Sequence, residues 1–198
     1  MSDRNGGING FTSLFPIKST TDRGAFRSLL RSFDSHPRGS PLSSVDLVHM
    51  ARFVIVDRLA FQGEPAAHDR LMSAYLLFAC DFDGSGVDEL VVAMATKTPE
   101  LVIAVWEHCV GFPGIGRADD RYSDLVRYFC RCRIPTTLFL ADQPGASVSQ
   151  ILRALVLKQA LADFVQQHQG SDPAIMQQEL HTMWQACQSA PTPIPGSC

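Results

Sequence analysis

The apolar positions of this chain follow two spacings, one typical of strands and one typical of amphipathic helices. The runs rich in β-branched and aromatic residues, which predict strands, cover residues 11–18, 47–57, 73–82 and 135–141. The stretches whose apolar residues recur at helical spacing cover residues 25–33, 88–96, 99–109, 122–132, 148–168 and 174–187. We expect the strands at 47–57 and 73–82 to pair antiparallel.

The order of these elements predicts an α+β fold with a ferredoxin-like βαββαβ core, in which helices cover one face of an antiparallel sheet. A C-terminal helix follows this core. Residues 1–10 are polar and glycine-rich and predict a disordered N-terminus, and residues 11–170 form the folded domain. Residues 171–198 are expected to contain the C-terminal helix and a flexible tail, because three prolines fall in the last ten residues.

The predicted strand at 47–57 is apolar on both of its faces. Strict alternation places on one face Val48, Met50, Val54 and Val56. It places on the other face Ala51, Phe53 and Ile55. Because helices are expected on only one face of the sheet, the other apolar face needs a second subunit to cover it, which predicts a homodimer. The helix at 174–187 is the alternative cover.

The composition is globular, with 45% hydrophobic and 19% charged residues, and the net charge is −3. The arginines form no basic run, so we expect no nucleic-acid partner. No apolar stretch reaches the roughly 20 residues of a membrane span, and the N-terminus has no apolar signal core. These features predict a cytoplasmic protein without a membrane partner, whose six cysteines are reduced.

His108 is the first candidate for chemistry, because it follows an apolar helix and stands between Glu107 and Cys109, next to a glycine-rich loop. A neutral imidazole can serve as an axial haem ligand or as a general base. The alternative is a structural histidine that interacts with the dipole and the last carbonyl groups of the helix.

His49 and Arg52 are the second candidates, both within the strand at 47–57. Alternation sends their side chains to opposite faces, so a β-bulge is required for them to converge. Arg52 could bind a carboxylate ligand, a haem propionate or bound oxygen. The alternative is an internal ion pair with Asp57 or Asp81, because an arginine in an apolar strand is costly when unpaired.

The segment from Asp81 to Gly86 has the spacing with which a calcium loop begins. An EF-hand loop requires a glutamate at its twelfth position, and this chain has Val92 there. The preceding residues also predict a strand instead of a helix. We therefore interpret this segment as a turn that ends a strand.

Three segments, FTSLFPIKSTTDRGAFRSLLRSF, VHMARFVIVDRL and SAYLLFACDFDG, resemble the dimeric α+β barrel superfamily over about residues 11–168. This group includes dye-decolourising peroxidases, chlorite dismutase-like haem proteins and small cofactor-independent monooxygenases. The resemblance implies that two sheets pack face to face and that a small-molecule ligand lies between sheet and helices.

The resemblance further implies a haem-dependent peroxidase or oxygenase that acts on a small apolar or aromatic substrate. His108 would be the metal ligand and a catalytic residue. Arg52 would bind the cofactor and assist catalysis, and His49 would be a further catalytic residue. Two alternatives stay open: a non-catalytic dimeric binding or accessory module, and a cofactor-independent monooxygenase or isomerase.

Overall fold

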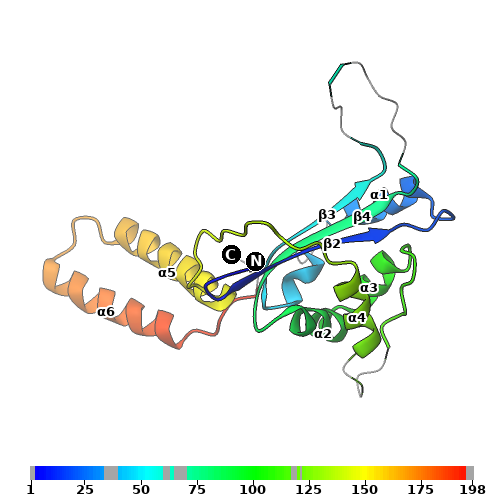
Figure 1. Ribbon diagram of the computed structural model, residues 1–198. Helices are drawn as coiled ribbons and strands as arrows, with labels where there is room; N and C mark the ends of the chain where they lie inside the picture. The colour runs from blue at the N-terminus through cyan, green and yellow to red at the C-terminus, as the bar shows by residue number, and fades with distance from the viewer. Residues whose placement is uncertain are drawn as a thin grey trace.

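The structure is a computed structural model that describes residues 3–33, 40–59, 63–64, 71–116, 120 and 122–194. The strands are β1 (Arg4–Asn5), β2 (Ile8–Pro16), β3 (Val48–Val56) and β4 (Tyr75–Asp83). The helices are α1 (Arg23–Ser32), the short 3-10 helix η1 (Pro41–Ser44), α2 (Val87–Lys97), α3 (Pro99–Trp106), α4 (Ser123–Arg131), α5 (Val148–Gln167) and α6 (Pro173–Ser189). Figure 1 shows their arrangement.

The strands form one four-stranded antiparallel sheet in the order β1-β2-β4-β3 (Figure 1). Strands β3 and β4 are neighbours and pair antiparallel, as their apolar patterns predicted. Strand β4 also pairs antiparallel with β2, so it lies in the middle of the sheet. The α+β class and the C-terminal helix are therefore confirmed.

The predicted fourth strand of the ferredoxin-like order, at residues 135–141, is not formed. The chain pairs with β2 by one isolated bridge between Ser13 and Arg133, in which the Ile134 N–H donates to the Thr12 carbonyl and the Leu14 N–H to the Cys132 carbonyl, both at 2.8 Å. The pairing ends there because the β1 hairpin occupies this edge of β2: the Gly10 N–H donates to the Asp3 carbonyl at 2.7 Å, and the Thr136 N–H donates to the Asp3 carboxylate at 2.9 Å. The exact ferredoxin-like order is thus not observed.

Residues 135–146, which we call the strap, instead cross one end of the sheet. The Phe139 ring lies on Gly10, where an added Cβ would be 2.8 Å from the ring. Farther along, the Gly7 N–H donates to the Pro144 carbonyl at 2.7 Å. The first ten residues, expected to be disordered, supply this contact, because β1 and the start of β2 pair as a hairpin from residue 4 onward.

Helices α1 to α4 pack on one face of the sheet and enclose an aromatic core. The ring centroids of Trp106 lie 4.9 Å from Phe129 and 5.3 Å from Phe78. The helix boundaries follow local signals: the Asp22 carboxylate accepts from the Gly24 N–H at 2.8 Å at the start of α1. Thr98 and Pro99 separate α2 from α3, as predicted.

The pairing of β3 with β4 shifts between Val48 and Met50, so that His49 is an extra residue in β3. This bulge corrects the expected faces. Val48 belongs to the helix-covered core and is 8% exposed, whereas Met50 on the other face is 53% exposed. Arg52 and Val54 lie on the Met50 face.

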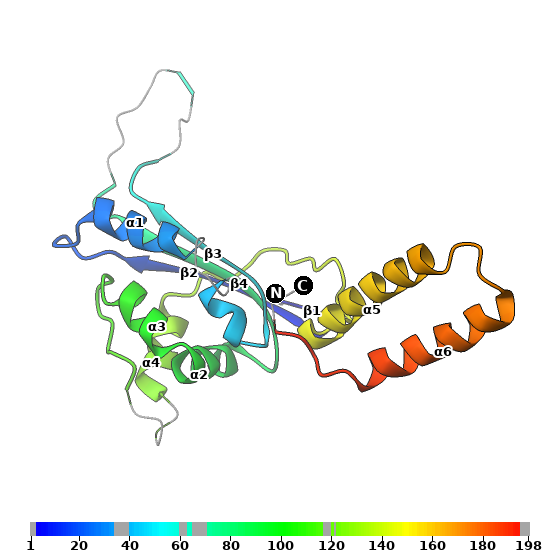
Figure 2. The same cartoon turned by 180° about the vertical axis from the view of Figure 1, so that it is seen from behind.

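We call this second surface the open face, because in the described part of the chain only the strap crosses it. Its central row contains Leu14, Leu77 and Val54, which are directly paired across the three strands. Helix α6, the other expected cover, does not reach it. Helices α5 and α6 instead form an antiparallel hairpin that projects from one end of the sheet, as Figure 1 and Figure 2 show.

Within the described ranges, no helix combines the length and the apolar character needed to cross a membrane.

Candidate functional site

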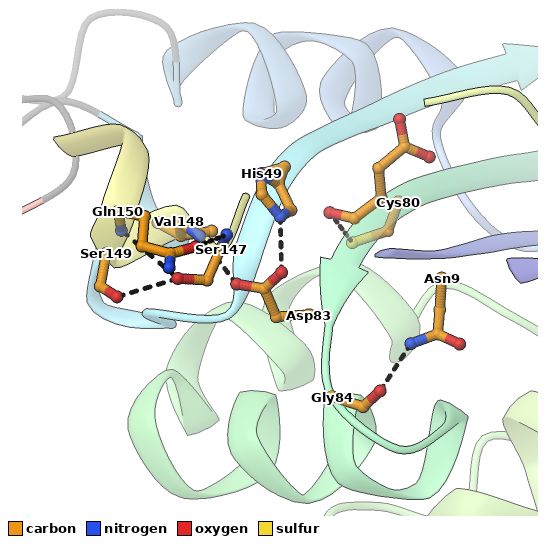
Figure 3. Close-up of polar contacts among 10 residues, drawn as sticks. Asn9, His49, Cys80, Asp83, Gly84, Ser147, Val148, Ser149 and Gln150 are labelled. Carbon is orange, nitrogen blue, oxygen red and sulfur yellow. Dashed lines mark hydrogen bonds and ion pairs between the residues drawn. The ribbon is translucent and has the colours of Figure 1, made fainter. Parts of the chain in front are cut away.

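His49 lies in a polar cluster at the end of the sheet where the strap meets α5 (Figure 3). Its Nε2 atom is 2.8 Å from the Oδ1 atom of Asp83, the last residue of β4. The side chains are only 14% and 23% exposed, respectively. The bulge in β3 makes this contact possible, since it frees His49 from the regular alternation of the strand.

The second carboxylate oxygen of Asp83 accepts a hydrogen bond from the Val148 N–H at 2.8 Å, at the first turn of α5. A carboxylate is favoured here, because a helix N-terminus has unpaired N–H groups and a positive dipole end. Ser147 and Gln150 satisfy further groups of this turn by a capping box. Asp83 therefore connects β3, β4 and α5 through one side chain (Figure 3).

This histidine–carboxylate pair resembles the base and orienting acid of hydrolytic sites in its contacts. Both Asp83 oxygens and the His49 Nε2 atom are occupied by each other and by α5. The pair is consequently arranged to hold the helical hairpin on the sheet. His49 and Asp83 thus form a structural junction between the sheet and α5.

Arg52 lies on the open face, next to Asp81. Burial raises the pKa of the Asp81 carboxyl, and the nearby charges of Arg52 and His49 act in the opposite direction. Of the two partners expected for Arg52, Asp57 forms an ion pair with Arg27 instead, with Oδ2 2.6 Å from Nη2. Asp81 is therefore the carboxylate on which the positive charge of Arg52 acts.

His108 lies at the other end of the sheet. Its ring packs against Phe26 with centroids 4.5 Å apart, and its carbonyl accepts from the Lys18 N–H at 2.9 Å. The adjacent Cys109 bridges to Ile17, whereas the His49 cluster lies beside Ile8. These two ends of β2 are about 30 Å apart at ~3.3 Å per residue.

The expected haem site needs His108 and Arg52 on one ligand, and the residues do not fit this arrangement. His108 contacts Phe26 on the helix-covered side of the sheet, while Arg52 belongs to the open face. One face of the His108 imidazole is already covered by an aromatic ring. His108 and Arg52 therefore do not form a shared haem site.

The thiol beside His108 is also unsuited to nucleophilic chemistry. Cys109 is fully buried, and this burial raises the pKa of its thiol to about 12. Each of the described cysteines is a free thiol, which agrees with the expectation of reduced cysteines. Within the described ranges, no group of three or more His, Cys, Asp and Glu residues is placed to hold a metal ion.

Sequence reasoning missed the roles of Asp83 and Val148. Asp83 was visible in the segment that imitates a calcium loop, but its carboxylate binds His49 and the first turn of α5. Its signal was an acidic residue at the end of an apolar strand. The partner N–H belongs to a residue 65 positions later, which no local pattern can indicate.

A second feature is a groove along one side of the helical hairpin, which we call the hairpin groove. Its lining combines apolar side chains with the polar side chains of Gln177, Gln178, His181 and Thr182. Near the tip of the hairpin, the groove is lined by Leu161, Leu180 and Trp184. Closer to the sheet, Trp184 also lines its continuation with Ala154 and Leu157. Leu161, Leu180 and Trp184 are 44%, 39% and 44% exposed, which is unusual for three neighbouring large side chains.

No family model, curated protein or solved structure matches the chain. The class of the protein therefore follows from its fold: it is an α+β protein with an antiparallel sheet, an open sheet face and a projecting helical hairpin. The resemblance to the dimeric α+β barrel superfamily stays a prediction.

Proposed function

We propose that the protein is a non-catalytic assembly module that pairs with a second copy of itself through the open face. The observation that carries this proposal is the apolar row of Leu14, Leu77 and Val54 on a sheet face that α1 to α4 do not cover. Met50 and Val54 on this face are 53% and 39% exposed in the single chain. Covering such a surface removes apolar area from water.

The charges of the open face favour a second copy as the partner. In a two-fold contact, each residue of one copy meets the partner's complementary residue. Arg52 and Asp81 supply one positive and one negative group next to the apolar row. Two open faces can therefore place Arg52 of each copy on Asp81 of the other without bringing like charges together.

The separation of the candidate residues supports a non-catalytic role. His49 is bound to Asp83, Arg52 is on the open face, and His108 is at the opposite end on the helix-covered side. A catalytic site needs its groups on one reacting centre, within hydrogen-bond reach.

A charge-swap experiment tests the proposed pairing. Arg52→Asp and Asp81→Arg are prepared separately, and each alone is expected to self-associate more weakly because like charges then face each other. When the two variants are mixed, complementary charges meet in both halves of the contact. Native mass spectrometry should then show mixed pairs in clear excess over the statistical proportion.

A statistical distribution of pairs in this mixture overturns the proposal. Arg58→Asp serves as the matched control, because Arg58 lies just beyond the end of β3. Mixing Arg58→Asp with Asp81→Arg should give no excess of mixed pairs. A haemin titration tests the non-catalytic part: a Soret shift that His108→Ala abolishes would support the haem-dependent alternative instead.

A further inference from the structure

The hairpin groove is a surface separate from the open face, with apolar side chains from both helices. Its apolar side chains recur at helical spacing. On α5 they are Ala154, Leu157 and Leu161, three and four residues apart, and on α6 they are Leu180 and Trp184, four residues apart. This is the spacing of residues that form the seam between packed helices. In a single chain, the outer side of this seam faces water.

Helix α6 is poorly buried in the single chain. Its 17 residues are all described, and none of them is buried in the single chain. The contacts of α6 are mostly with α5, whose C-terminal end is tied to it by a contact of 2.8 Å between His168 Nε2 and Glu179 Oε2. Helices of this length gain most of their stability from packing an apolar side, so a further partner is expected.

The distribution of charge identifies the partner. Among the described residues that line the hairpin groove, Arg153 is the only Asp, Glu, Lys or Arg, and its Nε donates to the Thr192 hydroxyl at 3.0 Å. The opposite side of the hairpin contains Asp163, Glu179 and His168. A surface with so few charges does not select an acidic or basic partner, and it can face an identical surface without repulsion.

The size of the groove side is also sufficient. Helix α5 has 20 residues. It is therefore about 30 Å long, and two adjacent helices are roughly 20 Å wide. This side thus offers on the order of 600 Å², so two copies would bury about 1,200 Å² together, which is the lower end of the range for specific interfaces.

We propose that the hairpin groove docks onto the hairpin groove of a second copy, so that two hairpins form a four-helix bundle. Trp184, which lines both parts of the groove where they meet, lies at the centre of this contact. This hairpin contact does not depend on pairing through the open face, because the two surfaces share no residue. If both contacts form about perpendicular, intersecting two-fold axes, they produce a tetramer; about one axis, they reinforce a single dimer.

Trp184 fluorescence tests the proposal directly. The chain has two tryptophans, and Trp106 is fully buried, so acrylamide quenching in the full-length protein reports mainly on Trp184. Subtracting the signal of Trp184→Phe isolates this residue. On assembly, the quenching constant of Trp184 should fall several-fold, and it should rise again on dilution. A quenching constant that stays at the value of an exposed tryptophan at every protein concentration overturns the proposal.

Light scattering on charged variants provides the second measurement. Leu161→Glu and Trp184→Glu, on different helices, should each weaken the hairpin contact at least about 30-fold, as expected for residues central to an interface. Ile175→Glu is the matched control: it introduces the same charge on α6 at a residue that is 54% exposed and lines the opposite side. It should change the association by about two-fold or less.

Repeating these measurements in the Arg52→Asp background separates the two contacts. If only the hairpin contact exists, Arg52→Asp leaves the mass unchanged and Trp184→Glu alone yields single chains of 21.7 kDa. If only the open-face contact exists, Arg52→Asp alone does so, and Trp184 stays quenchable at every concentration. Equal effects of Ile175→Glu and Trp184→Glu would also overturn the docking of the groove.

Discussion

Single residues in this protein act by their contacts with distant parts of the chain. The side chain of His49, displaced by the bulge, reaches Asp83, and Asp83 reaches the main chain of Val148. Asp81, two positions before Asp83, has no such bond to α5 and lies on the open face near Arg52. Two neighbouring aspartates thus have different tasks, one in a structural junction and one on a proposed interface.

The acid–base behaviour of Asp81 gives a prediction for the single chain. Burial raises its pKa above the ordinary 3.8, so folding favours the protonated form. The stabilising effect of the protonated carboxyl is full below the unfolded pKa and is lost as the pH rises through the higher folded pKa. Asp81→Asn should therefore make the dilute protein more stable than the wild type near pH ~7, by less than about 1 kcal/mol because the group is partly solvated.

Urea unfolding of dilute protein between about pH 3 and 7 measures this difference. The gap between Asp81→Asn and the wild type should close toward acid pH, where the wild-type carboxyl is also neutral. At concentrations where copies pair through the open face, Arg52 of the second copy would stabilise the ionised carboxylate of Asp81. Asp81→Asn should then weaken pairing. A variant that is less stable than the wild type at neutral pH in dilute solution would contradict the burial argument.

At the scale of elements, the strap and the helical hairpin are held by a few close contacts instead of by sheet pairing. Gly6 has a φ of +61° and lies under the strap, where an added Cβ would be 2.0 Å from the Pro144 carbonyl oxygen. Only glycine adopts this conformation easily and leaves room for the carbonyl. The N-terminal hairpin and the strap are therefore mutually dependent.

Gly6→Ala should cost about 1–3 kcal/mol, because the backbone conformation is strained and the Pro144 carbonyl must move. Thermal unfolding followed by circular dichroism measures the loss. Gly145→Ala is the control, since an added Cβ there meets no atom within 4 Å. It should change the stability by less than about 0.5 kcal/mol. Equal losses in both variants would show that the close approach at Gly6 is not what matters.

The junction at Asp83 is the second test at this scale. Asp83→Ala removes the acceptor of the Val148 N–H and the partner of His49. We expect a loss of about 1–2 kcal/mol, as for a missing helix cap, and faster amide hydrogen exchange in the first turn of α5. Asp142→Ala, at an exposed position in the strap, should leave the exchange of α5 unchanged. Unchanged protection of Val148 in Asp83→Ala would mean that α5 is held by other contacts.

At the scale of the whole molecule, one chain presents two apolar surfaces that it does not cover itself. The open face is one face of the sheet, and the hairpin groove is formed by side chains of α5 and α6. These two helices project from the end of the sheet (Figure 1). Both are expected to be buried between copies. The stability of such a protein depends on concentration, because association favours the folded chain by mass action.

The wild-type melting temperature should therefore rise by several degrees when the protein concentration increases about a hundred-fold. Combining Arg52→Asp with Trp184→Glu should abolish this dependence, and Ile175→Glu should preserve it. Differential scanning calorimetry across this concentration range makes the measurement. A melting temperature that is constant for the wild type would argue against both proposed contacts.

The helices and the three long strands were predictable from the sequence because their signals are local. Asp22 and Pro99 mark helix starts by their own chemistry, and the apolar spacing of α5 and the alternation of β4 repeat within one element. The apolar run at 135–141 gave the wrong element, since its composition suits a strand but the N-terminal hairpin occupies the edge of β2 that it would pair with. The face of Val48 was also wrong, because strict alternation cannot include a bulge.

The candidate site was predictable only in part. His49 and Arg52 were identified as polar residues in an apolar strand, and the need for a bulge was recognised. Which residues they meet depends on contacts across 34 and more positions of the chain, as in the bond between His49 and Asp83. The sequence by itself determined the elements, because short-range sterics and hydrogen bonding decide them. It also determined the two-sided apolar character of the strands, because that character follows from the residue types themselves. The tertiary structure alone decided which face stays open, where the strap runs and where the hairpin projects, because those depend on packing between segments that are far apart along the chain.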